Sequence, residues 1–294
     1  MENPKIQRRE NAGKKIKSKK VRIISLILIL LITVAVFAFD TRLNTVFYTV
    51  ETDKFKGSVR LALLCDLHSC AYGTDQKQLI KAIQDQKPDA VVLGGDIFDD
   101  ALAHDNAEIL LQAVTESYPC FYVTGNHEYW SDDVEEIFTL LRGYDVTILQ
   151  GSGETLILNG CALNICGIDD PEAEDAFGEP DLMQEQLDSL KPLGQNGLFT
   201  VLLAHRPEYV HIYLEYPFDL ILSGHAHGGQ WRIPGVLNGL FSPGEGWFPR
   251  YAGGNYSFEN TTMIVSRGLA KKSGGVPRVF NRPELVIIDI LSSA

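Results

Sequence analysis

Five short apolar segments, each followed directly by polar side chains that can bind metal ions, constrain the fold of this chain more than any other feature. The segments are predicted to be buried strands because each is a run of mostly aliphatic residues bounded by turn signals. In open α/β sheets, binding sites gather at the carboxyl ends of strands, so the polar residues should converge. Those residues are Asp66 with His68, Asp96, Asn126 with His127, His205, and His225 with His227.

Helix-like segments alternate with these strands and indicate the class of fold. Amphipathic helices are predicted at 75–89, 107–117 and 132–144, and residues 155–169 alternate as the two arms of a β-hairpin do. Two further strands follow near the C-terminus, in "TTMIVSRG" and "PELVIIDIL". The mixture predicts a layered α/β domain with two sheets and outer helices.

The N-terminus predicts a membrane anchor. Residues 1–22 carry nine Lys/Arg and two Asp/Glu, and the run 21–39 that follows is almost wholly apolar, with Arg22 as its one charge. As a helix this run extends about 28 Å, which nearly crosses a hydrocarbon core of about 30 Å. A cleaved signal peptide is the main alternative, although no small-x-small cleavage site follows cleanly. We expect a basic tail at 1–20, a transmembrane anchor at 21–39, a linker at 40–54 and a domain at 55–294.

The distribution of charge bounds the location and the partners. The basic residues precede the apolar run, which predicts a single-pass plasma-membrane protein with a cytoplasmic N-terminus and an extracytoplasmic domain. The whole chain has a net charge of −12, but residues 1–22 contribute +7, which leaves −19 for residues 23–294. Nucleic acid is therefore not expected as a partner, since its binding rests on Lys/Arg contacts to phosphate. We expect the protein to be a monomer.

The polar cluster has the composition of a metal centre. Asp66 and His68 are two residues apart, so on an extended chain both would face one side and share one ion. Asp96 has two carboxylate oxygens that can bridge two ions, and Asn126 offers an amide oxygen. Carboxylate, amide and imidazole ligands without thiolate suit Mn, Fe, Zn or Co. Two such ions about 3.5–4 Å apart are the arrangement used for displacement at phosphorus.

The order of these motifs resembles that of the calcineurin-like metallophosphoesterases. The family pattern is D-x-H, G-D, G-N-H-[DE], a lone H and G-H-x-H. It stands here as "DLH" (66–68), "GGD" (94–96), "GNHE" (125–128), "AHRP" (204–207) and "GHAH" (224–227). The segments "GHAHGGQWRIP", "VSRGL" and "PRVFNRPELVIIDI" also resemble a subgroup of membrane-associated or exported bacterial phosphoesterases, which includes enzymes that act on UDP-diacylglucosamine.

The resemblance implies a fold and a site. The fold is a four-layer α/β/β/α sandwich of two mixed sheets, with a dinuclear metal site at the carboxyl ends of the strands. The implied ligands of two divalent ions are Asp66, His68 and His227 for the first, Asn126, His205 and His225 for the second, and Asp96 as the bridge. His127 is implied to face the phosphate and to assist the leaving group instead of binding metal.

The implied function is hydrolysis of a phosphoester by a hydroxide that the two metals activate. We expect the substrate to be a membrane lipid-linked phosphodiester or pyrophosphate, because residues 228–258 are rich in aromatic side chains that can form an apolar lip. These are Trp231, Phe241, Trp247, Phe248, Tyr251, Tyr256 and Phe258. Ordinary packing in the core is the alternative role for most of these side chains. The alternatives are a hydrolase of soluble nucleotides or small phosphodiesters, and a non-catalytic membrane-anchored binding protein.

Several further residues have two interpretations. Arg206, Arg267 and Arg278 can bind substrate phosphate, because guanidinium forks match phosphate oxygens, or can form structural ion pairs. Glu128 is interpreted as an acid that stabilises its loop. Asp169 and its neighbour Asp170 are expected to begin a solvated loop. The five cysteines form no CxxC pair and are interpreted mainly as small buried side chains.

Overall fold

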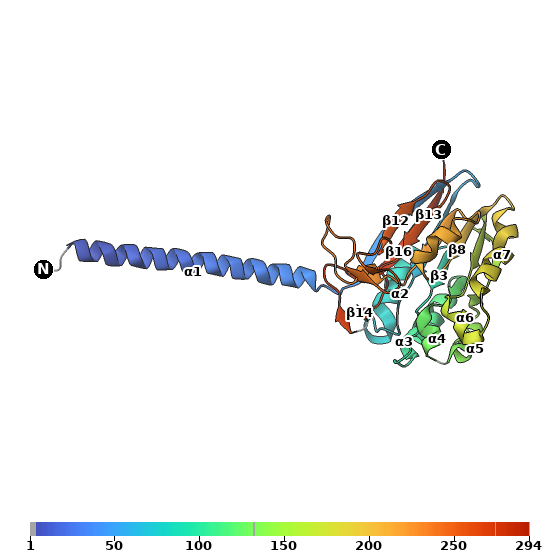
Figure 1. Cartoon of the computed structure of the whole chain (residues 1–294), viewed down its shortest axis with the longest axis horizontal. Helices are drawn as coiled ribbons and strands as arrows, with labels where there is room; N and C mark the ends of the chain where they lie inside the picture. The colour runs from blue at the N-terminus through green and yellow to red at the C-terminus, as the bar shows by residue number, and fades with distance from the viewer. Residues whose placement is uncertain (1–3, 132, 274, 294) are drawn as a thin grey trace. The chain divides into compact units, whose positions relative to one another are not determined.

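The computed structural model describes residues 4–131, 133–273 and 275–293. The chain divides into two compact units, Met1–Asp40 and Thr41–Ala294. The first unit contains one long helix, α1 (Pro4–Ala38) (Figure 1). Its part Lys19–Ala38, which is 20 residues long with a mean hydropathy of 2.8, could cross a membrane by length and composition. A signal sequence near an N-terminus has the same length and composition, so the helix alone does not separate the two.

The second unit contains two six-stranded sheets. The strand order of the first is β1-β16-β2-β3-β4-β5, with β16 antiparallel to β2 and the other neighbours parallel. These strands are β1 (Asn44–Thr52), β16 (Glu284–Ser292), β2 (Ser58–Leu64), β3 (Ala90–Gly94), β4 (Cys120–Val123) and β5 (Thr147–Ile148).

The second sheet has the order β12-β13-β9-β8-β7-β6, with parallel pairs at its centre and an antiparallel pair at each end. Its strands are β12 (Gly254–Ser257), β13 (Thr262–Val265), β9 (Leu220–Ser223), β8 (Phe199–Leu203), β7 (Cys161–Gly167) and β6 (Ser152–Leu158). The hairpin predicted over 155–169 is confirmed as β6 and β7. Asn159 and Gly160 turn it with φ angles of 47° and 77°, as a tight two-residue hairpin requires.

Three apolar clusters pack against the two sheets. The first contains side chains of both sheets, and the other two lie between one sheet and its helices. In β2, Leu61 and Leu63 belong to the first cluster, whereas Ala62 and Leu64 belong to the second, because successive side chains of a strand alternate between faces. Both faces are therefore buried, which explains why the strands are near-continuous apolar runs. The helices are α2 (Lys77–Gln86), α3 (Asp105–Thr115) and α5 (Val134–Gly143) on the first sheet, and α7 (Leu182–Gly194) and α8 (Val210–Tyr213) on the second.

Shorter elements join these layers. Two hairpins, β10–β11 and β14–β15, and two short helices, α4 and α6, lie in the connections. Their bounds, with those of three 3-10 turns, are β10 (Phe241–Ser242), β11 (Gly246–Trp247), β14 (Lys272–Ser273), β15 (Val276–Pro277), α4 (Asn126–Trp130), α6 (Glu172–Phe177), η1 (Thr74–Gln76), η2 (Pro207–Tyr209) and η3 (His227–Gly229).

The segment 40–54, which the sequence predicts to be a linker, is mostly strand. Residues 44–52 form β1 and pair in parallel with β16 along their whole length, from Asn44 opposite Glu284 to Thr52 opposite Ser292. Of these residues, Val50 and Thr52 are buried. An edge strand of this kind lacks the continuous apolar run of a central strand, and its partner lies at the far end of the sequence.

Candidate metal centre

The loops that follow five parallel strands meet at one site. β2, β3 and β4 lie side by side in the first sheet, and β8 and β9 lie side by side in the second. Each ends just before a residue that was predicted to bind metal. Because parallel neighbours end at the same edge of a sheet, the loops of each sheet bring their polar residues together. The expected location at the carboxyl ends of strands is therefore confirmed.

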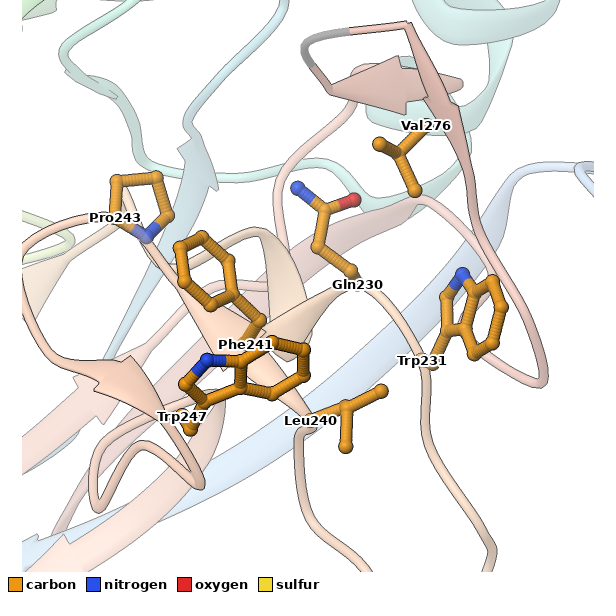
Figure 2. A pocket seen from close by; sticks show the side chains of 7 residues that line it. All are labelled: Gln230, Trp231, Leu240, Phe241, Pro243, Trp247 and Val276. Carbon is orange, nitrogen blue, oxygen red and sulfur yellow. The ribbon is translucent and has the colours of Figure 1, made fainter.

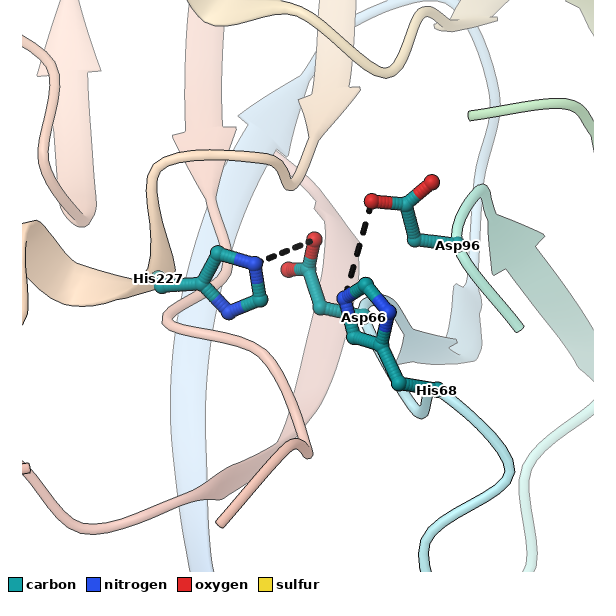
Figure 3. Close-up of side chains that lie close together, drawn as sticks. All are labelled: Asp66, His68, Asp96 and His227. Carbon is teal, nitrogen blue, oxygen red and sulfur yellow. Dashed lines mark ion pairs between the residues drawn. The ribbon is translucent and has the colours of Figure 1, made fainter. Parts of the chain in front are cut away.

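One group of four side chains can hold a cation. The candidate ligand atoms of Asp66, His68, Asp96 and His227 all lie within 4.8 Å of one another. His68 Nε2 lies 3.6 Å from Asp96 Oδ2, and His227 Nε2 lies 3.9 Å from Asp66 Oδ1 (Figure 3). These four side chains come from three different loops, and all are buried.

A second group shares one member with the first. The ligand atoms of Asp96, His205 and His225 also lie within 4.8 Å of one another, and His205 Nε2 is 3.3 Å from Asp96 Oδ2. His205 Nε2 is 3.8 Å from Asp66 Oδ1, so the two groups adjoin. Asp96 thus occupies the position that a bridging carboxylate requires.

The polar atoms of the site are buried and lack protein partners. Each of the seven predicted ligands keeps one buried nitrogen or oxygen without a hydrogen-bond partner among the described residues. These atoms are Asp66 Oδ2, His68 Nε2, Asp96 Oδ2, Asn126 Oδ1, His205 Nε2, His225 Nε2 and His227 Nδ1. Burial of polar atoms without partners is costly, and native proteins rarely gather such atoms in one place unless a ligand satisfies them. The donor set, with nitrogen and oxygen and no thiolate, fits two divalent ions.

The charge state of two imidazoles also suits metal binding. Burial holds the pKa values of His225 and His227 well below the usual value of histidine, and the neutral form is the one that binds a metal. Burial also opposes protonation of His205, but the carboxylates of Asp96 and Asp66 raise its pKa to about 10. A cation at the site would replace that proton, because imidazole must be deprotonated to serve as a ligand.

The backbone of the site adopts a conformation that side chains ordinarily avoid. Asp66, His68, Asp96, His225 and His227 have φ angles of 51°, 46°, 52°, 63° and 46°, in the left-handed region. Strain of this kind is rare outside glycine and clusters at functional sites. The extended chain expected at the first two of these residues is therefore wrong: β2 ends at Leu64, and a tight turn, not strand alternation, aims both side chains inward.

Glu128 holds two of the loops together. Its buried carboxylate accepts hydrogen bonds from the backbone nitrogens of Asp96 (3.0 Å), Ile97 (2.8 Å), Phe98 (3.1 Å) and Gly125 (2.7 Å). Charge-assisted bonds of this kind are stronger than neutral ones, so they offset part of the backbone strain at Asp96. The interpretation of Glu128 as a loop-stabilising acid is confirmed.

His127 lies beside the two ligand groups and keeps more access to solvent. Its side chain is 24% exposed, and its Nδ1 lies 2.7 Å from Asp100 Oδ1. Its ring meets the ring of His68 edge-on, with centroids 4.3 Å apart. Asp99 lies 3.4 Å from His68 Nδ1 in the same way. Neither carboxylate is predicted from the sequence, although Asp99 and Asp100 follow Asp96 by three and four residues.

Three arginines proposed as phosphate ligands are engaged elsewhere. Arg206 donates to both oxygens of Asp170, at 2.8 and 3.0 Å, and also pairs with Glu172. Arg278 is 1% exposed and donates to the carbonyl oxygens of Ala270, Gly268 and His227. Arg267 pairs with Glu284. These contacts favour structural roles for the three arginines, and substrate binding by Arg206 and Arg278 stays a prediction of the sequence.

The other expectations for polar residues are settled by burial. Asp169 and Asp170 are 4% and 1% exposed, so the expected solvated loop is wrong. The buried acid Asp169 accepts hydrogen bonds from Thr124 and Gln186.

All five cysteines are free. Burial raises the pKa of Cys65 well above its usual value, which favours the neutral thiol over the nucleophilic thiolate.

Two glycines leave room for the carboxylates. A Cβ on Gly125 would lie 2.2 Å from Asp96 Oδ1, and a Cβ on Gly268 would lie 2.5 Å from Asp66 Oδ2. Gly268 also has a φ of 74°. It follows β13, in the segment "VSRGL" (265–269), to which the sequence assigned no role at the site; its spatial approach to Asp66 makes it part of the site.

Comparison with known proteins is consistent with this geometry. The family model of calcineurin-like phosphoesterases matches residues 59–229. An "uncharacterized metallophosphoesterase" of Helicobacter pylori is 32% identical over 80% of this chain, and the chain spans 60% of its length. "Phosphodiesterase YaeI" of Escherichia coli is 29% identical over 70% of this chain and 72% of its own. The crystal structure of TT1561 of Thermus thermophilus shares the fold, with a TM-score of 0.50, 13% identity, and coverage of 73% of this chain and 92% of that one.

We expect Gly268→Ala to weaken metal binding by about 10- to 100-fold, the usual scale for residues that support metal ligands, because the new Cβ must displace Asp66. Gly178→Ala is the matched control: its φ is 68° and a Cβ there meets nothing within 4 Å. Titration of both metal-free variants with Mn²⁺ or Zn²⁺ measures the difference. Equal affinities in the two variants would contradict the role assigned to Gly268.

Proposed function

The chain belongs to the calcineurin-like phosphoesterase family, and from that membership we propose that it hydrolyses the phosphodiester or pyrophosphate bond of a lipid-linked substrate at a membrane. The chain is a metallophosphoesterase, and members of its family hold a dinuclear divalent metal centre. The observation that carries the site assignment is that two groups of potential ligands share Asp96. The three apolar clusters also support the four-layer α/β/β/α order that the sequence implies.

The proposed roles follow from the contacts at the site. Asp66, His68 and His227 would hold the first ion, His205 and His225 would hold the second, and Asp96 would serve both. Asn126, whose buried Oδ1 has no hydrogen-bond partner among the described residues, would complete the second set, as the family resemblance implies. When bound, two divalent ions supply the charge that activates water and neutralises phosphoryl oxygens during displacement at phosphorus.

His127 provides the proton for the leaving oxygen, because it is the least buried imidazole of the site and lies outside both groups that contain Asp96. With His68 and Asp99 it forms a third, less buried group whose ligand atoms lie within 4.8 Å of one another. Asp100, at 2.7 Å from His127 Nδ1, is a positioning residue: it fixes the ring so that Nε2 is free to face the substrate.

An apolar pocket next to the metal loop supports a lipid-linked substrate. It measures about 520 Å³, and Figure 2 shows the side chains that line it: Gln230, Trp231, Leu240, Phe241, Pro243, Trp247 and Val276. Its wall rests on the metal loop, because Leu240 N donates to Gly229 O at 2.8 Å and Gln230 follows directly after η3. Trp247 remains 68% exposed. A pocket of this composition suits the acyl chain of a lipid whose head-group phosphate lies at the metals.

The predicted aromatic lip divides into two parts. Trp231, Phe241 and Trp247 line the pocket. Tyr251 is buried in the third apolar cluster, where Tyr256 and Phe258 also pack. The residues of the second part serve packing, so the proposal rests on the first part. The resemblance to enzymes acting on UDP-diacylglucosamine stays a prediction of the sequence.

The proposed location is the outer face of the plasma membrane, with α1 as a single-pass anchor and residues 1–20 in the cytoplasm. The helix segment Lys19–Ala38 and the basic residues before it support this orientation. Residues 39–43 connect α1 to β1. This connection extends at most about 18 Å, so an inserted helix would keep the start of the domain within reach of lipid head groups.

We expect Asp96→Ala to lose both metal ions and nearly all hydrolysis, whereas His127→Ala should keep both ions and lose about 100-fold or more in kcat, the scale of general acid help. Metal analysis and hydrolysis of bis(p-nitrophenyl) phosphate measure the two effects. In His127→Ala, a substrate with a poorer leaving group should slow further than this activated one. Retention of two ions at wild-type affinity in Asp96→Ala would refute the bridge.

We expect Trp247→Ala to raise KM about tenfold on a phospholipid or a lipid-linked pyrophosphate, with no change on the deacylated head group, because only the lipid reaches the pocket. Phe248→Ala is the matched control. Phe248 is the next residue and equally exposed, at 67% against 68% for Trp247, but does not line the pocket. If the wild-type protein cleaves the free head group as efficiently as the lipid, the substrate is a soluble phosphodiester instead.

We expect protease added to intact protoplasts to digest the domain and to spare residues 1–20, because the basic tail is retained on the cytoplasmic side. Antibodies against a tag at each end follow the two parts separately. Full protection of the domain until the cells are lysed would reverse the proposed orientation.

A further inference from the structure

A second pocket is lined by the residues that follow Trp231 and contains two arginines. Its volume is about 400 Å³, and it is formed by residues 232–238 together with Arg267 and Phe280. It takes no part in the chemistry described above. Residues 23–294 carry a net charge of −19. Two positively charged guanidinium groups in one pocket are therefore unusual in this acidic part of the chain.

One of these two arginines is paired with a buried carboxylate. Glu284 is buried, and its Oε2 accepts from Arg267 Nε at 2.6 Å while its Oε1 accepts from Arg267 N at 2.8 Å. Arg267 is therefore neutralised by Glu284. Among the described residues, Glu284 makes no hydrogen bond or ion pair with Arg232, although its negative charge acts to raise the pKa of Arg232 from further away.

Arg232 has only neutral hydrogen-bond partners in the described part of the chain. Its Nη1 donates to Gly228 O at 3.2 Å, and its Nη2 donates to Asn238 Oδ1. It lies close to Arg267, because a Cβ on Gly253 would be 2.6 Å from Arg267 Cγ and 3.5 Å from Arg232 Nη1. Burial and then the positive charge of Arg267 lower the pKa of Arg232. A half-buried guanidinium that lies beside a like charge and pairs directly with no carboxylate is costly unless an anion binds to it.

The pocket also borders the metal loop. The carbonyl that Arg232 contacts belongs to Gly228, in the turn η3 that begins with His227. A charged group bound at Arg232 would therefore lie next to the loop that presents His227 to the first ion.

We propose that the pocket formed by residues 232–238, Arg267 and Phe280 binds a phosphoryl group of the substrate other than the one that is cleaved. This assignment rests on the proposed function, since it places the scissile phosphorus at the metals. Guanidinium forks match phosphoryl oxygens and form charge-assisted bonds with them. The substrate class is then a phosphodiester or pyrophosphate that carries a second phosphoryl group.

The first arm of the test measures binding without catalysis. The full-length protein is freed of metal with a chelator, so that ions at the catalytic centre bind no phosphate, and is titrated with inorganic phosphate by calorimetry. We expect one site in the wild-type protein, with affinity at least tenfold weaker in Arg232→Gln and intermediate in Arg232→Lys, which keeps the charge but loses the fork. Arg250→Gln is the matched control, because Arg250 is exposed and stacks on Tyr251 outside the pocket.

The second arm distinguishes a substrate-borne phosphoryl group from a free phosphate ion. The metal-loaded protein is given p-nitrophenyl phosphodiesters of alkanediols with spacers of two to six carbons, whose far hydroxyl is either free or phosphorylated. We expect the far phosphate to lower KM about tenfold at one spacer length in the wild-type protein and in Arg250→Gln. This preference should be lost in Arg232→Gln, with the kcat ratio of the paired substrates unchanged.

Each outcome decides between these assignments. Absence of phosphate binding in the metal-free protein, or equal binding in Arg232→Gln, overturns the site. Phosphate binding without any KM preference overturns the substrate-borne form and leaves a site for free phosphate. If the wild-type protein hydrolyses none of the diesters, the proposed function fails, and the first arm still decides whether the pocket binds an anion.

Discussion

The position of the Asp96 carboxylate is the constraint on which the rest of the site depends. Its Oδ2 belongs to both ligand groups, while its Oδ1 accepts a hydrogen bond from His127 N at 2.9 Å. One oxygen therefore stays directed at the metals and the other anchors the loop after β4. Because β3 and β4 are parallel neighbours in the first sheet, this bond also sets the distance between the two loops. Catalysis by two cations requires such a fixed separation.

The strained backbone around Asp96 is compatible with a stable domain because contacts with the surrounding structure hold it in that conformation. Residues in the left-handed region each cost of the order of 1–3 kcal/mol and persist only where other contacts enforce them. Glu128 supplies four backbone hydrogen bonds to the loops that carry Asp96 and Asn126. Glycines at the points of closest approach, such as Gly125, leave room for the carboxylates. The strained backbone, the buried carboxylate of Glu128 and the glycines together direct the ligand side chains into the site.

The segment between β9 and β12 gives this site its surroundings. After η3 the chain passes through Trp231, which contributes to the apolar pocket, and then through Arg232, which contributes to the cationic one. Both pockets are thus built by residues that follow directly after a metal-binding loop. A substrate with an apolar part and a second charge is the chemistry that such a pair of pockets suits, and it is compatible with an anchor at a membrane.

The sequence by itself determined the candidate ligands, because each directly follows an apolar strand and the ends of parallel strands must converge. It also determined the hairpin and the central strands, whose patterns are local. Only the tertiary structure decided that β1 pairs with β16, that Arg206 is held by Asp170, and that Gly268 abuts Asp66. In each case the partner is remote in sequence, from 36 residues for Arg206 to opposite ends of the domain for β1. Local sequence patterns indicate that a residue is polar or that a strand is half-buried. The partner with which that residue or strand pairs depends on how the two sheets pack.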